Sequence, residues 1–145
     1  MFRILLVEDN RGDVLLVQES LKEHGITHEL HVVTDGAAAI RFLAAAGAPG
    51  AAPLPDLLLL DLNLPRVDGP QVLHEVREHS LLAKMPVIVV TSSDAPSDRA
   101  RVNALGISHY FQKPCDYDGF MKLGEVVREV MADPRQNGQA VVTNS

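Results

Sequence analysis

Three acids, one hydroxyl and one amine lie at or near the ends of apolar runs in this sequence of 145 residues. Glu8 and Asp9 follow the first run, Asp61 follows a second, and Thr91 and Lys113 close two later ones. Three close carboxylates repel one another, and a hard divalent cation such as Mg²⁺ relieves that repulsion. Lys113 would add a positive charge, and Thr91 could donate a hydrogen bond to an added oxyanion. Together these groups would suit a site that holds a phosphoryl group beside a metal, with Asp61 as its acceptor.

The pattern of apolar and turn residues predicts the elements that would bring these groups together. The run Leu57–Leu60 stops at Asp61 and is followed by proline and glycine, which is typical of a buried parallel strand. We predict strands over 2–7, 28–34, 56–61, 86–90 and 108–112. We predict helices over about 14–24, 37–46, 69–79 and 96–105, and a last one around the apolar stripe Phe120, Leu123, Val127 and Val130.

Five alternations of strand and helix favour an α/β class, a flavodoxin-like (βα)5 doubly wound parallel sheet with strand order 2-1-3-4-5. All strands of such a sheet end at one edge, so the polar groups that close them should meet there. We expect one domain over residues 1–132 and a flexible tail over 133–145, where the sequence becomes polar.

Composition excludes several other classes of function. The net charge of −6 argues against binding to nucleic acid or to an anionic membrane surface, because both need a basic face. No apolar stretch approaches the ~18 residues that a membrane span needs. A single cysteine, Cys115, rules out an intrachain disulfide and fits a cytoplasmic location.

Five short motifs occur in order at the predicted strand ends, and together they resemble the receiver domain of two-component response regulators over residues 1 to about 132. They are Val7-Glu8-Asp9-Asn10, Leu60-Asp61-Leu62-Asn63-Leu64-Pro65, Asp68-Gly69, Thr91-Ser92 and Lys113-Pro114. The long loop before Asp56 and the segment 29–36 are similar to a stand-alone subfamily that includes cyanobacterial-phytochrome response regulators.

The resemblance implies a role for each site residue. Asp61 would accept a phosphoryl group. Mg²⁺, for which Mn²⁺ can substitute, would be bound by Asp9 and Asp61, with Glu8 assisting through water and Asn63 giving its backbone carbonyl. Lys113 would pair with the phosphoryl oxygens.

The resemblance also implies how the protein would switch. Thr91 would move toward the phosphoryl group, and Tyr110 would swing inward with it. The peptide that corresponds to Lys113-Pro114 is cis in this family, and the sequence alone leaves its isomer in this chain open. The switched surface would be the face made by helix 96–105, strand 108–112 and the last helix, a candidate surface for partners or for a homodimer.

The implied donor is a sensor histidine kinase or a histidine phosphotransfer domain, with a phytochrome-like kinase suggested by the subfamily. The downstream partner is unknown. Such a protein is a phospho-acceptor switch that catalyses its own aspartyl phosphorylation and dephosphorylation and no other reaction.

Two other functions compete with this interpretation. A phosphatase of the haloacid-dehalogenase type would need a second acid two residues after its aspartate, where this chain has Asn63. A receiver-like module that only binds partners would lack the acidic pair, the acceptor or the lysine, and all three are present. Asp61 could also be a helix cap or a loop acid. Glu8 and Asp9 could cap the first helix, although Asp13 is a better candidate for that role than either of them.

Overall fold

The computed structural model describes residues 1–132, which form a single five-stranded sheet flanked by helices. The predicted tail, residues 133–145, lies outside the described residues. The strands are β1 (Phe2–Val7), β2 (His28–Val33), β3 (Leu57–Leu60), β4 (Val87–Thr91) and β5 (His109–Gln112). They pair in parallel in the order β2-β1-β3-β4-β5, which confirms the predicted flavodoxin-like topology.

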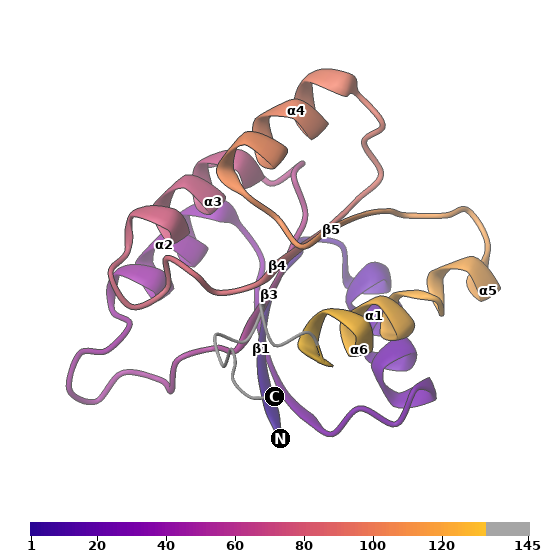
Figure 1. Cartoon of the computed structure of the whole chain (residues 1–145), viewed down its shortest axis with the longest axis horizontal. Helices are drawn as coiled ribbons and strands as arrows, with labels where there is room; N and C mark the ends of the chain where they lie inside the picture. Colours follow the sequence, from indigo (N-terminus) through magenta and orange to yellow (C-terminus); the bar gives the residue numbers. More distant parts are fainter. Residues whose placement is uncertain (133–145) are drawn as a thin grey trace, which may run out of the picture.

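Helices cover both faces of the sheet, which Figure 1 shows nearly edge-on. One side carries α2 (Gly36–Ala44), α3 (Gly69–Glu78) and α4 (Pro96–Leu105), and the other carries α1 (Arg11–Glu23), α5 (Tyr117–Phe120) and α6 (Leu123–Ala132). Alternate residues of each strand therefore enter two separate cores, so Leu57 and Leu59 face α1 and α6 while Leu58 and Leu60 face α2 and α3. The central strand β3 is buried over its whole length, as its unbroken leucine run predicts.

The last helix differs from the prediction, because it is divided into α5 and α6. At the division the carbonyl of Met121 accepts a hydrogen bond from Ser20 Oγ at 2.8 Å, and His24 Nε2 lies 2.9 Å from the same oxygen. The amide of Glu125 turns instead to Lys122 O at 3.1 Å. Ser20 of α1 and His24, the C-cap residue of that helix, thus take the carbonyl that a continuous helix would have used.

None of the helices within residues 1–132 is long and apolar enough to cross a lipid bilayer.

Candidate functional site

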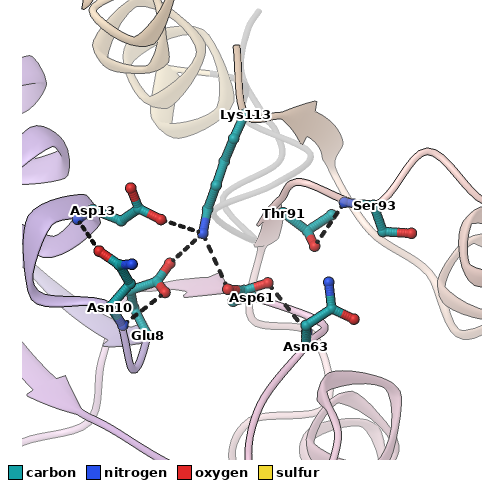
Figure 2. Close-up of polar contacts among 8 residues, drawn as sticks. All are labelled: Glu8, Asn10, Asp13, Asp61, Asn63, Thr91, Ser93 and Lys113. Atoms are coloured by element: carbon teal, nitrogen blue, oxygen red, sulfur yellow. Dashed lines mark hydrogen bonds and ion pairs between the residues drawn. The ribbon is translucent and has the colours of Figure 1, made fainter. Parts of the chain in front are cut away.

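The sheet brings the predicted polar residues to one edge, and Figure 2 shows four of them there, Glu8, Asp61, Thr91 and Lys113. The backbone amide of Asp61 donates to Val7 O at 3.1 Å, and that of Lys113 donates to Thr91 O at 2.7 Å. These bonds continue the ladders β1–β3 and β4–β5 by one step past the strands. The side chains that follow the strands are therefore fixed by the sheet itself.

Glu8, Asp9 and Asp61 form a group that could hold a metal ion. Each offers a carboxylate oxygen, and these oxygens lie within 4.8 Å of one another. Glu8 and Asp61 are buried, at 1% and 5% exposure, whereas Asp9 is exposed. The Oε1 atom of Glu8 is buried and lies 2.8 Å from Lys113 Nζ, with which it forms an ion pair. A hard cation with oxygen ligands fits this set of donors.

Lys113 lies at the centre of the acids. Its Nζ atom is 2.7 Å from Asp13 Oδ2, 2.8 Å from Glu8 Oε1 and 3.1 Å from Asp61 Oδ2. The lysine side chain is 11% exposed. Because water is largely excluded, these ion pairs are less screened than pairs on the surface.

Burial shifts the pKa of Glu8 and the pKa of Lys113 in opposite directions. It raises the pKa of Glu8 to about 7, with a further contribution from the charge of Asp61 and a partial offset from Lys113. For Lys113, burial alone would lower the pKa, but the hydrogen bonds to Asp13 and Glu8 and the charge of Asp61 outweigh it and hold the pKa above its usual value. The lysine is therefore a fixed cation, whereas Glu8 titrates near neutrality.

Asp61 and Thr91 are each held by the backbone two residues further along. Asn63 N donates to Asp61 Oδ1 at 3.2 Å, and Ser93 N donates to Thr91 Oγ1 at 3.3 Å. Thr91 is fully buried and lies on the Asp61 side of its loop in Figure 2, whereas Ser92 is exposed. The residue of this hydroxyl-rich segment that faces the site is thus Thr91. Asn63 is exposed at the start of the β3–α3 loop.

Tyr110 stands apart from the ion-pair network and joins β5 to the β4–α4 loop. Its hydroxyl donates to Ser93 O at 2.9 Å, and the guanidinium carbon of Arg99 lies 4.0 Å from its ring centroid. The ring thereby connects the strand next to Lys113 with the first turns of α4.

One expectation needs correction, and the structure supplies the isomer of the Lys113-Pro114 peptide, which the sequence left open. Asp13 is not the cap of α1, because Asn10 holds that position and its side-chain oxygen accepts from Asp13 N at 2.9 Å. The sequence offered only the spacing of an acid in the first turn as a signal for its contact with Lys113. The Lys113-Pro114 peptide is trans, since no peptide bond within residues 1–132 is cis. The trans form is the intrinsically preferred one even before proline.

Known proteins are similar to this chain in both sequence and fold. A family model, the response regulator receiver domain, matches residues 4–123. Response regulator Rcp1 of Synechocystis sp. is 42% identical over 120 residues, which span 83% of this chain and 82% of Rcp1.

Solved structures agree with that match. The Mn²⁺-bound form of Rcp1 is similar with a TM-score of 0.80 and 38% identity, over 90% of this chain and 94% of that one. The phosphorylated cyanobacterial phytochrome response regulator RcpA is similar with a TM-score of 0.80 and 35% identity, over 88% of this chain and 91% of RcpA. A third similar structure is the receiver domain of sensor histidine kinase PA1611 from Pseudomonas aeruginosa, which has magnesium in its active site cleft. Its TM-score is 0.72 and its identity 25%, over 91% of this chain and 98% of that one.

Receiver domains are signalling switches rather than classical enzymes, and they interact with sensor histidine kinases. With its five-stranded 2-1-3-4-5 sheet, its acidic group at the carboxyl edge and a family match over most of its length, this chain belongs to the response regulator receiver domain family.

Proposed function

We propose that this chain is a phosphorylation-controlled switch in which Asp61 accepts a phosphoryl group from a histidine of a sensor kinase or a histidine phosphotransfer domain. The observation that carries the proposal is the position of Asp61. Its carboxylate lies 3.1 Å from the ammonium of Lys113 and within the same group of oxygens as Glu8 and Asp9. An acceptor oxygen, a fixed cation and a cation site thus lie within reach of one phosphoryl group.

The metal would be Mg²⁺, with Mn²⁺ as a substitute. Asp9 and Asp61 would be direct ligands, Glu8 would act through water, and Asn63 would contribute its backbone carbonyl. The carboxylate oxygens of Glu8, Asp9 and Asp61, which lie within 4.8 Å of one another, support this assignment, as do the Mn²⁺-bound and magnesium-bound relatives. The cation would supply positive charge beside the phosphoryl oxygens.

In the transfer itself, an oxygen of Asp61 forms a bond to phosphorus as the bond from phosphorus to the histidine nitrogen breaks. The leaving imidazole keeps the electron pair. Lys113 stabilises the charge on the phosphoryl oxygens, and the Thr91 hydroxyl donates to one of them. Hydrolysis of the acyl phosphate by water reverses the switch. Both reactions are promoted by the domain on itself.

The added phosphoryl group brings roughly 1.5 to 2 negative charges into the site. Thr91 would move toward this charge. Because Ser93 N donates to Thr91 Oγ1 and Tyr110 donates to Ser93 O, this movement would displace Ser93 and with it the contact to Tyr110. The outcome would be a shift of Tyr110 and of the face made by α4, β5 and α6, the helix that the sequence predicted as the last. This face is the proposed surface for a downstream partner or for a homodimer.

We further propose that residues 1–132 make up the receiver domain and that the protein acts in the cytoplasm, where kinases have ATP. The likeness to RcpA and Rcp1 supports a phytochrome-like kinase as the upstream partner. Phosphotransfer from the kinase encoded nearest to this chain tests that choice.

The proposed function is tested with a small phosphodonor such as phosphoramidate, with and without Mg²⁺. The protein should gain one phosphoryl group that is stable to acid and labile to base, and the gain should require Mg²⁺. Asp61→Asn should abolish it. The matched control is Asp56→Asn at the opposite end of β3, where the carboxylate accepts from Arg3 N at 2.8 Å. Persistent labelling of the Asp61 variant would refute the assignment.

A further inference from the structure

Four residues close a ring of contacts at the start of α1, drawn in Figure 2. Lys113 Nζ contacts Glu8 Oε1 at 2.8 Å and Asp13 Oδ2 at 2.7 Å. Asn10 joins the two acids, because its amide donates to Glu8 Oε2 at 3.1 Å and its side-chain oxygen accepts from Asp13 N at 2.9 Å. From this ring we infer that Asp13 is a positioning residue for phosphoryl transfer, which acts by holding the ammonium of Lys113. The inference rests on the proposed function of Asp61.

The ring explains why the carboxylate of Asp13 is available. An acid at the third position of a helix commonly bonds back to the amide of the N-cap residue. Here the N-cap residue is Asn10, and its amide already donates to the side chain of Glu8. Asp13 is held through its own backbone amide instead, so its side chain points across to β5 and Lys113.

The position of Asp13 outside the metal group gives it a distinct role. Of the three acids that contact Lys113 within residues 1–132, Glu8 and Asp61 belong to the group that could bind a cation, and Asp13 does not. A cation that engages Glu8 and Asp61 would compete with Lys113 for their oxygens. Asp13 would then remain as the partner that keeps the ammonium beside the acceptor.

Lysine needs such a partner because its side chain is long and flexible, and holding its ammonium in one place restricts many rotamers. The Asp13 carboxylate is only 24% exposed, and the lysine is 11% exposed. A pair this sheltered orients its members better than a surface pair does. It would hold the charge of Lys113 ready before the phosphoryl group arrives.

The test is a double-mutant cycle on the rate of phosphorylation by phosphoramidate at saturating Mg²⁺. Asp13→Asn keeps the shape of the side chain and removes its charge, and we expect it to slow the reaction roughly tenfold, since small misplacements of a catalytic group are costly. Lys113→Ala should slow the reaction at least as much. Adding Asp13→Asn to Lys113→Ala should then change little, because Asp13 acts through the lysine.

Glu19→Gln is the matched control, an exposed acid on the same helix that removes one charge away from the site. Its rate should equal that of the unaltered protein. Equal slowing by Asp13→Asn with and without Lys113 would overturn the inference, because Asp13 would then act independently of the lysine. An unchanged rate would overturn it as well.

Thermal unfolding without metal or phosphodonor gives a second cycle that does not depend on the proposed function. Asp13→Asn should lower the Tm when Lys113 is present and barely change it in Lys113→Ala. Equal shifts in both backgrounds would overturn the pairing. If the unaltered protein takes up no phosphoryl group, the proposed function fails and the inference with it. Failure of the inference alone appears only in the Asp13 variants.

Discussion

Gly36 and Val67 approach so closely that no Cβ atom fits between them. A Cβ built on Gly36 would lie 1.8 Å from the carbonyl oxygen of Val67. The amide of Gly36 also donates a hydrogen bond to Pro65 O at 3.4 Å. The first residue of α2 thus supports the loop that leads from Asp61 to α3. The obstacle is backbone, so a side-chain rotation cannot relieve it.

Gly36→Ala should therefore displace this loop and destabilise the fold by about 1–3 kcal/mol, the usual cost of forcing extra atoms into a packed site. Urea unfolding measures the change. Gly12→Ala is the control, because it lies in α1 and its new Cβ would meet only Asn10 Oδ1 at 3.2 Å. Similar stability of the two variants would show that the loop adjusts freely.

Mg²⁺ should stabilise the protein, because the folded site has four carboxylates, Glu8, Asp9, Asp13 and Asp61, against the single ammonium of Lys113. At ten times the dissociation constant, binding to the folded state alone adds about 1.4 kcal/mol. The Tm should rise with millimolar Mg²⁺ and not with KCl of equal ionic strength. Glu8→Gln should reduce the rise. An unchanged Tm in the unaltered protein would count against the metal site.

The raised pKa of Glu8 predicts a pH dependence of stability in the absence of metal. Between its ordinary value of 4.5 and about 7, the folded state holds the proton of Glu8 more tightly than the unfolded state does. Stability contributed by this group is therefore present at pH 4.5 and is lost as the pH rises to 7, by up to about 3 kcal/mol.

Urea unfolding at intervals from pH 5 to 8, with a chelator present, measures this loss. Glu8→Gln cannot ionise at this position, so its curve should be flatter over the same range. Parallel curves for the two proteins would mean that other groups cause the pH dependence.

Arg77 should be a major source of stability for α4, because it joins the end of α3 to the end of α4. Its guanidinium donates to Gly106 O at 2.7 Å, to Met85 O at 2.9 Å, to Ala83 O at 3.1 Å and, from Nε, to Leu105 O at 3.2 Å. Arg77→Ala leaves these carbonyls without their donor, and we expect a loss of about 2–4 kcal/mol.

Chemical denaturation measures the effect, and Arg41→Ala on the exposed side of α2 is the control. If the two arginine variants were equally stable, the carbonyls around Arg77 would be solvated well enough without it.

The sheet and the site were predictable from the sequence because both depend on local patterns. The run Leu57–Leu60 identifies a strand that is buried on both faces, and the parallel topology then places Asp61 beside the residues that end the other strands. The structure adds their distances and the contact of Asp13 with Lys113. The matches to known receiver domains agree with this interpretation.

Other features depend on contacts between distant residues, and the sequence could not show them. Asn10 and Asp13 are both good caps, and the sequence could not show that the side chain of Asp13 contacts Lys113, which is 100 residues away. The division between α5 and α6 arises because Ser20, which is 101 residues away, binds Met121 O. A pattern of apolar residues contains no information on either choice.

The central claim is that Asp61 is the residue that carries the phosphoryl group. Borohydride reduces an aspartyl phosphate to homoserine, so treatment of the phosphorylated protein followed by peptide mass spectrometry locates the modified position directly. We predict homoserine at position 61, and none in protein that was not exposed to the phosphodonor. Homoserine at Asp9, Asp13 or any other aspartate, with Asp61 unaltered, would contradict the account.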